Sequence, residues 1–447
     1  MRRELVGRLK RLKDAQSVSS RNTAGTTATG ERHGCSRQGG SQNGVSGAGA
    51  GTAGTTGFVP TGLDGWENPA PHVFRRTTEV RLRSDVASHP AISGTEPFHS
   101  HLLSREVSPD ELLYLDTETT GLSGGAGTTV FLTGAGRCFH GAIHVTQILM
   151  TDFPGEPDYL LEVLDAVGND RSWVSYNGKA FDSRLLEGRF LMNGIPFERP
   201  EQIDLLYPTR RLYRDHLVDC SLGTVEAALL SVARGHDIPG MEIPDRYFDF
   251  LRSGDASGLT DVFRHHLQDI VSLALLFVHL ERVLDAPRTA RGLDRFQLAR
   301  WLLDLDRVDG IDLLSDVLSS PRAEEDTEKR CRAGILLGTA HRRTGDLVGA
   351  EEAWQAAVRL GSIPAAIELA KLYEHRLRDL DAARAVLEEI TRKFPSLKTD
   401  PLIQRRAARI EGKRQGGDAG VVRETRGRPA TRDGCGRSRS RRRRSGG

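Results

Sequence analysis

The sequence predicts an α/β domain with a mixed sheet, followed by an all-α helical region, between two low-complexity ends. Three observations predict this class. Three strand-like segments in a row precede alternating helical and strand-like segments over residues 111–284. Residues 293–412 read as helical and contain an internal repeat. The two ends are rich in Gly, Ser, Thr and Arg and poor in large apolar residues.

The segments outside the two predicted domains carry little apolar patterning. Residues 1–57 cannot bury enough apolar surface to offset ordering entropy, so we predict a disordered basic and Gly/Ser/Thr-rich segment. Residues 58–110 place isolated aromatics among turn residues and predict an irregular flap. Residues 413–447 end in "RSRSRRRRSGG" and predict a disordered Arg-rich tail, which could attract phosphates or act only as a solubilising end.

Five strands are expected in the α/β domain. The first three are "LLYLDTE", "TVFLTGAGRCF" and "AIHVTQILM", and the last two are "SWVSYNG" and the start of "EQIDLLYP". The segments "EPDYLLEVLDAVG" and "AFDSRLLEGRFLMNG" have helical periodicity. Because the first three strands follow one another and the rest alternate with helices, the pattern predicts a sheet of mixed orientation.

The helical region repeats with a period typical of helix-turn-helix units. "GDLVGAEEAWQAAV" from Gly345 aligns with "RDLDAARAVLEEI" from Arg378, with Asp346 over Asp379 at an offset of 33. This period predicts tetratricopeptide-like repeats, and an ordinary helical bundle is the alternative. Stacked repeats bury each other's apolar faces, so we expect them to bind a protein partner or the α/β domain.

The composition of the sequence limits the cellular compartments in which the protein could work. The net charge is only +2 over 447 residues, because Arg-rich ends offset a more acidic middle. Five cysteines are scattered along the chain without a CxxC spacing: Cys35, Cys138, Cys220, Cys331 and Cys435. This pattern argues against a disulfide framework or a zinc site. It favours a reducing compartment, and we expect the cytoplasm. The most apolar segment, "IVSLALLFVHL", is too short to span a bilayer, so we expect no membrane partner.

Two carboxylates end the first strand. Side chains two residues apart leave the same face of a strand, so Asp116 and Glu118 point the same way. Two charges about 4 Å apart repel by roughly 4 kcal/mol at an effective dielectric near 20. The pair lies either at an exposed strand end in water or around hard divalent cations, which prefer carboxylate oxygens.

Two further acids add to this pair. Asp182 stands at a helix start, where it could cap the helix or bind a cation. Asp269 lies within an apolar helical stripe, which is costly unless the acid is paired or metal-bound. His265 is four residues earlier, one turn away on the same face, and is placed to act as a base.

The motifs together resemble a known family. "LDTETTGL", "YNGKAFD" and "HHLQD" are similar to the three motifs of DEDD-type exonucleases with an RNase H-like fold, and with the repeats the chain resembles bacterial YprB-like proteins. The resemblance implies a mixed five-stranded sheet with the acids along one rim. It also implies that four acids hold two Mg²⁺ or Mn²⁺ ions: Asp116, Glu118, Asp182 and Asp269.

The third motif raises the question of the general base. Some relatives carry a Tyr four residues before the final Asp, and His265 occupies that position here. The resemblance therefore implies that His265 accepts the proton. His266 is the alternative, but it points about 100° away on a helix, so we favour His265.

The predicted activity is metal-assisted, 3′ to 5′ exonucleolytic hydrolysis of DNA or RNA phosphodiesters. The alternative is a non-catalytic nucleic-acid-binding module or protein-interaction scaffold with the same fold. A phosphotransfer motif of the DxDxT type fits less well, because Glu118 stands where the second Asp is needed. No motif separates DNA from RNA or single strands from duplexes with a 3′ end.

Overall fold

The computed structural model describes residues 60–94, 96–121, 127–168, 172–235, 237–320 and 326–423. The chain divides into two compact units with a boundary between Leu298 and Ala299, inside helix α10 (Arg295–Asp304). The segment predicted to be disordered at the N-terminus, residues 1–57, lies outside the described residues.

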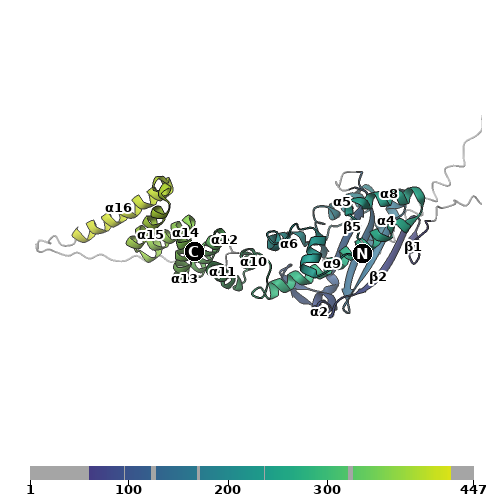
Figure 1. Cartoon of the computed structure of the whole chain (residues 1–447), viewed down its shortest axis with the longest axis horizontal. Helices are drawn as coiled ribbons and strands as arrows, with labels where there is room; N and C mark the ends of the chain where they lie inside the picture. The colour runs from purple at the N-terminus through teal and green to yellow at the C-terminus, as the bar shows by residue number, and fades with distance from the viewer. Residues whose placement is uncertain are drawn as a thin grey trace, which may run out of the picture. The chain divides into compact units, whose positions relative to one another are not determined.

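A seven-stranded mixed sheet forms the centre of the first unit (Figure 1). Its spatial order is β1-β2-β7-β6-β5-β8-β9. Neighbouring strands from β1 to β5 are antiparallel, whereas β5–β8 and β8–β9 are parallel. The strands are β1 (Glu67–Ala70), β2 (Val73–Arg81), β5 (Leu112–Thr119), β6 (Val130–Phe139), β7 (Ala142–Met150), β8 (Ser172–Ser175) and β9 (Glu201–Asp204). The predicted mixed α/β class is confirmed, and β5 to β9 are the five expected strands.

The sheet is larger than expected because the segment predicted to be an irregular flap supplies two strands. β2 pairs with β7 along its whole length, from Val73 opposite Met150 to Arg81 opposite Ala142. Its sequence, "VFRRTTEVR", contains Thr and Val but also three arginines that obscure the apolar alternation. The rest of the segment forms short elements: α2 (Ser84–Ala87), α3 (Pro90–Ser93) and the hairpin of β3 (Phe98–Ser100) and β4 (Arg105–Val107).

Helices cover both faces of the sheet. On β6, Thr133 bonds to Tyr159 of α4 (Glu156–Val167), whereas the neighbouring Gly134 faces Ile270 of α9 (Thr260–Asp285). Because successive strand residues point to opposite faces, α4 and α9 lie on opposite sides of the sheet. The other helices of this unit are α5 (Asp182–Met192), α6 (Leu206–Tyr213), α7 (Leu222–Val225), the single turn η3 (Glu226–Leu230) and α8 (Ile243–Ser253).

The second unit is all helical and contains the predicted repeat as two helical hairpins. Asp346 and Asp379 occupy the same place in the two hairpins: each caps a helix by accepting a backbone N–H three residues ahead, from Gly349 and Ala382 respectively. The tetratricopeptide class stays a prediction. The helices are α11 (Asp309–Ser319), α12 (Thr327–Thr344), α13 (Leu347–Leu360), α14 (Ile363–Leu372), its continuation η6 (Tyr373–Leu377), α15 (Leu380–Lys393) and α16 (Pro401–Arg423).

Helix α16 carries the regular structure further than expected. The predicted tail begins at residue 413, but α16 continues to Arg423. The buried Glu374 anchors this helix, because its carboxylate accepts hydrogen bonds from Arg406, Arg409 and Lys413 at 2.6–3.1 Å. Residues 424–447, with the arginine run, lie outside the described residues.

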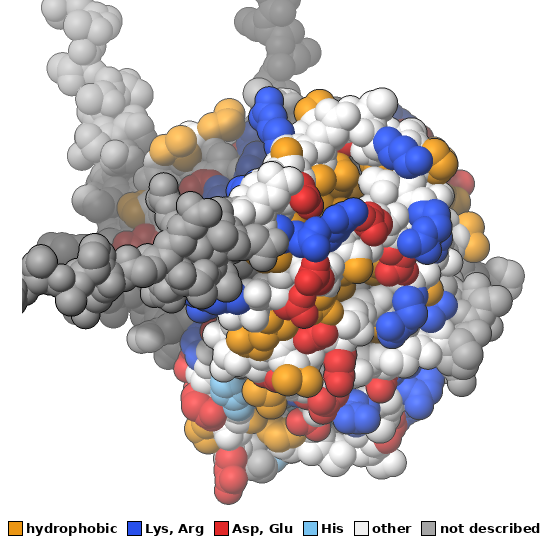
Figure 2. Space-filling view, turned by 90° about the vertical axis from the view of Figure 1, so that its left-hand side faces the viewer, with side chains coloured by type: hydrophobic (Ala, Val, Ile, Leu, Met, Phe, Trp, Pro, Cys, Tyr) orange, Lys and Arg blue, Asp and Glu red, His pale blue; other side chains and the backbone are white. Residues whose placement is uncertain are grey.

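The face that Figure 2 shows carries charged side chains of both signs. Acidic and basic side chains are interspersed there among the coloured, described residues. Among the helices that the structure describes, none is long and apolar enough to cross a bilayer.

Candidate metal centre

The first two acids of the site lie on β5, the strand between β6 and β8. Asp116 lies opposite Gly134 of β6, on the face that α9 covers, and Glu118 follows on the same face. The preceding residue on this face, Tyr114, is fully buried and contacts Phe277 of α9 edge to face. The strand therefore runs from an apolar core to the site, which places the carboxylates at the end of β5.

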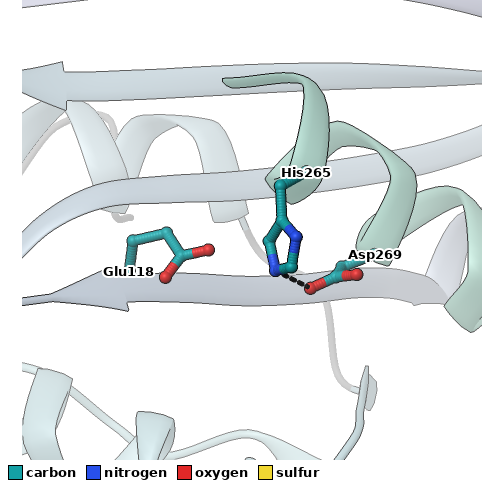
Figure 3. A group of neighbouring side chains, drawn as sticks. All are labelled: Glu118, His265 and Asp269. Carbon is teal, nitrogen blue, oxygen red and sulfur yellow. Dashed lines mark ion pairs between the residues drawn. The ribbon is translucent and has the colours of Figure 1, made fainter. Parts of the chain in front are cut away.

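Helix α9 supplies the histidine and the third acid. His265 and Asp269 are one turn apart, and the His265 Nε2 lies 3.3 Å from an Asp269 carboxylate oxygen (Figure 3). Glu118 faces them from β5 (Figure 3). One donor atom from each of these three residues lies within 4.8 Å of the others. Two of the four acids and the histidine predicted from the sequence are thus brought together.

Asp182 reaches β5 from the other side. It begins α5, and the Thr117 hydroxyl donates a hydrogen bond to its carboxylate. Thr117 alternates with Asp116 and Glu118 and therefore points to the opposite face. Asp182 is buried and does not belong to the three-residue group.

Asp116 is tied to α9 rather than to the three-residue group. The His266 Nε2 lies 3.1 Å from the Asp116 carbonyl oxygen and 3.7 Å from a carboxylate oxygen. His266 is fully buried, and this burial lowers its pKa to about 4. The residue considered from the sequence as an alternative base is therefore packed in the core beside an acid.

The acids influence one another electrostatically. Burial raises the pKa values of Asp116 and Glu118 well above the usual range, and the charges of Asp269 and then Asp182 add to the rise in both. Burial also raises the pKa of Asp269, and it raises that of Asp182 to about 6 against the hydrogen bond from Thr117. All four acids thus lie within electrostatic reach. Oxygen-rich donors that resist ionisation together fit a hard divalent cation, which would relieve their repulsion.

A cationic side chain that the sequence reasoning missed lies beside these acids. Arg234 forms ion pairs with Glu226 of η3, Asp237 and Asp269. Glu226 is fully buried, and an acid inside the apolar segment "TVEAALL" was the one signal in the sequence. Burial acts to lower the pKa of Arg234, but the bond to Glu226 and the charge of Asp269 raise it overall.

Asp237 was also missed. One of its carboxylate oxygens lies 2.6 Å from the His265 Nδ1. Burial opposes the change, but the hydrogen bond with His265 lowers the pKa of Asp237. The Arg234 Nη1 lies farther from the same nitrogen, at 3.2 Å. Because the Asp237 carboxylate is the nearer partner and cannot donate, we assign the proton to Nδ1, and Nε2, which lies 3.3 Å from an Asp269 oxygen, is the basic nitrogen.

Asp204 holds the turn that leads to Asp182. Its carboxylate accepts the backbone N–H groups of Asn177 at 2.8 Å and Lys179 at 3.1 Å. Asn177 adopts the left-handed conformation, with φ of 63°, which this turn requires. The Lys179 side chain is exposed. Asp204 thus acts as a hydrogen-bond acceptor that orders the loop between β8 and α5.

Comparison with known proteins agrees with this geometry. A family model described as the RNase H superfamily matches residues 113–281, the region that contains all four acids. The uncharacterized protein YprB of Bacillus subtilis (strain 168) is 30% identical over 302 residues, covering 65% of this chain and 71% of that protein. These findings confirm the resemblance to YprB-like proteins and the RNase H-like domain, whereas the DEDD type stays a prediction. The chain belongs to the YprB family, and its first unit carries an RNase H superfamily domain.

Proposed function

We propose that the chain is a metal-dependent nuclease that removes nucleotides from the 3′ end of DNA or RNA. The observation that carries the proposal is the convergence of Glu118, His265 and Asp269, with donor atoms within 4.8 Å, beside the partly buried Asp116. An RNase H superfamily domain over residues 113–281 supports a nuclease-like fold. The polarity of degradation rests on the likeness to DEDD-type exonucleases.

The four acids are the proposed ligands of two Mg²⁺ or Mn²⁺ ions. Asp116, Glu118 and Asp269 line the α9 face of β5, and Asp182 approaches from the side of Thr117. When bound, such cations supply positive charge to the attacking water and the departing 3′ oxygen. The acids hold these charges in place at a site where burial strengthens electrostatic interactions.

His265 is the proposed general base. Asp237 holds its Nδ1 at 2.6 Å, which fixes the ring and leaves Nε2 to accept a proton from the attacking water. The side chain of His265 is 12% exposed, so the ring can be reached from solvent. In the proposed role, Asp237 positions the base and does not touch substrate.

The architecture of the helical unit supports a second role, the binding of another protein. Its two capped hairpins share one apolar core around Trp354, Leu369 and Ile390, as stacked repeats do. We propose a protein partner for this unit, and a scaffold without catalysis is the alternative function of the whole chain. Cys138, Cys220 and Cys331 are free thiols, which agrees with the proposed cytoplasmic location.

The test is hydrolysis of labelled oligonucleotides by the purified full-length protein. Single-stranded and duplex DNA and RNA, labelled at either end, are incubated with Mg²⁺ or Mn²⁺. We expect 5′-labelled strands to shorten progressively and 3′-labelled strands to release a labelled mononucleotide first. Asp116→Asn should lower the rate at least about 100-fold, equivalent to about 2.7 kcal/mol of barrier.

The matched control is Asp261→Asn, which removes the charge of a half-exposed acid of α9 paired with Arg264. It should cleave like the native protein. Equal cleavage by Asp116→Asn, or no cleavage by the native protein with either ion, would contradict the nuclease assignment. Cation-dependent nucleic-acid binding without cleavage would instead support the scaffold.

A further inference from the structure

A chain of hydrogen bonds crosses the sheet and ends at Asp116. Arg76 of β2 donates to the side-chain oxygen of Gln147 on β7 at 2.9 Å. The amide nitrogen of Gln147 lies 2.9 Å from the Phe263 carbonyl oxygen and 3.0 Å from the His266 Nδ1. Gln147 and His266 are both fully buried. The chain therefore links β2, which lies outside the matched superfamily region, to the acid that begins the site.

Arg76 and the Phe263 carbonyl determine which atom donates in each hydrogen bond of this series. The Arg76 guanidinium can only donate and the Phe263 carbonyl can only accept, so the Gln147 amide has one possible orientation. Its N–H group therefore points to the His266 Nδ1. A nitrogen that accepts a hydrogen bond carries no proton, so the ring is neutral and its proton lies on Nε2.

That Nε2–H group faces Asp116, 3.1 Å from its carbonyl oxygen and 3.7 Å from a carboxylate oxygen. The ring has little freedom to turn away. A Cβ atom at Gly134, the partner of Asp116 on β6, would lie only 2.6 Å from the His266 Cε1, so the ring packs directly on the backbone. Arg76 is itself held, with its guanidinium carbon 4.8 Å from the centre of the Trp66 ring.

We propose that His266 is a positioning residue for Asp116, and that Arg76 and Gln147 set the tautomer that it needs for this role. The inference rests on the proposed function, because the orientation of Asp116 matters there as that of a cation ligand. Partners that orient metal ligands in this way change metal affinity without touching the ion. The two adjacent histidines then have opposite tautomers: His265 carries its proton on Nδ1, facing Asp237, and His266 on Nε2.

The tautomer is tested first, on the native full-length chain. Ring-¹⁵N-labelled histidine distinguishes a protonated from an unprotonated nitrogen by chemical shift, and the His266 signals are assigned in the native protein by through-bond correlation to the backbone. We expect a neutral ring near neutral pH with the proton on Nε2. A proton on Nδ1, or a fully protonated ring, would overturn the inference, whether or not the protein cleaves nucleic acid.

The positioning role is tested by Mn²⁺ affinity, measured by titration calorimetry on two variants. In H266Q the amide reaches the place of Nε2 and keeps a donor toward Asp116, whereas in H266N it reaches only the place of Nδ1. We expect H266N to weaken Mn²⁺ binding by about 10- to 100-fold and H266Q by less than about tenfold. The control H279N alters another histidine of α9, which bonds to Tyr213, and should bind like the native protein.

Circular dichroism and thermal unfolding establish that each variant is folded. Equal affinity of folded H266N and native protein, or equal loss in both His266 variants, would overturn the inference. If neither variant folds, the tautomer of the native chain decides. A failure of the proposed function gives a different result. If the native protein binds Mn²⁺ in this His266-dependent way but hydrolyses no oligonucleotide, the inference stands and the nuclease assignment is wrong. Native protein that binds no Mn²⁺ overturns both.

Discussion

Asp182 shows how a single buried carboxyl ties the stability of this fold to pH. Its pKa is about 6 in the fold, against an ordinary value of 3.8. An acid whose pKa is raised by folding binds its proton more tightly in the folded chain, so its ionisation destabilises the fold. The cost is absent below pH 3.8, grows as the pH rises to 6 and is complete above that value. At about 1.4 kcal/mol per pKa unit, the full cost is on the order of 3 kcal/mol.

Asp182→Asn removes this charge and keeps an oxygen for the Thr117 hydroxyl. Without divalent cations, we expect the variant to be more stable than the native protein at about pH 8, by on the order of 3 kcal/mol, and to lose this gain toward about pH 4. Urea unfolding in a chelating buffer at several pH values measures the difference. A gain independent of pH would contradict the assignment of the cost to ionisation.

Local geometry made part of the site predictable at the scale of residues. Strand alternation predicts that Asp116 and Glu118 share a face, and the helical repeat predicts that His265 approaches Asp269. The contact of His266 with Gln147 could not be predicted in this way, because 119 residues separate them. The ion pairs of Arg234 depend on the path of an irregular loop, which no periodicity encodes.

At the scale of elements, the approach of α9 to the sheet depends on Gly134. A side chain there would collide with Ile270 and the His266 ring of α9. Gly134→Ala should therefore destabilise the first unit by about 1–3 kcal/mol, as overpacking does, and weaken Mn²⁺ binding because His266 is displaced from Asp116. Chemical denaturation and titration calorimetry measure the two effects.

The matched control is Gly188→Ala in α5. A Cβ atom at Gly188 meets no atom within 4 Å, and alanine is the better helix former by about 1 kcal/mol. This variant should be as stable as the native protein or more so, with unchanged Mn²⁺ affinity. If Gly134→Ala behaved like Gly188→Ala, the close contact between β6 and α9 would not limit the site.

The elements differ in how well the sequence reveals them. The five strands β5 to β9 are detectable because their apolar runs are long or end in clear turns. β2 is not predicted because three arginines interrupt its alternation of apolar and polar residues. One of these, Arg76, is held at Trp66 and Gln147, partners that only the folded sheet brings close. The sheet therefore contains two strands that local patterning does not predict.

At the scale of the whole molecule, each unit has its own apolar core, so a change in one core should act locally. Glu374→Gln leaves three basic side chains of α16 without their shared carboxylate. Hydrogen bonds to charged groups contribute about 1.5–3 kcal/mol, so we expect a loss of this order in the helical unit. Hydrogen–deuterium exchange should accelerate in α14 to α16 and remain unchanged in β5 and α9.

Glu388→Gln is the control in the same unit, because Glu388 forms an exposed pair with Arg384. Exposed pairs contribute roughly 0–1 kcal/mol, so exchange should hardly change. Exchange that accelerated equally in β5 after Glu374→Gln would show that the two cores do not respond separately.

The added strand β2 has a practical consequence for any fragment cut at the limits of the superfamily match, residues 113–281. Such a fragment lacks β1 and β2, so the nine residues of β7 would become a bare sheet edge. Open edges recruit strands from other molecules, and the shortened polypeptide would tend to self-associate. It would also lack Arg76, and with it the donor that orients the Gln147 amide. Expression boundaries for the first unit therefore belong before Glu67, at the start of β1.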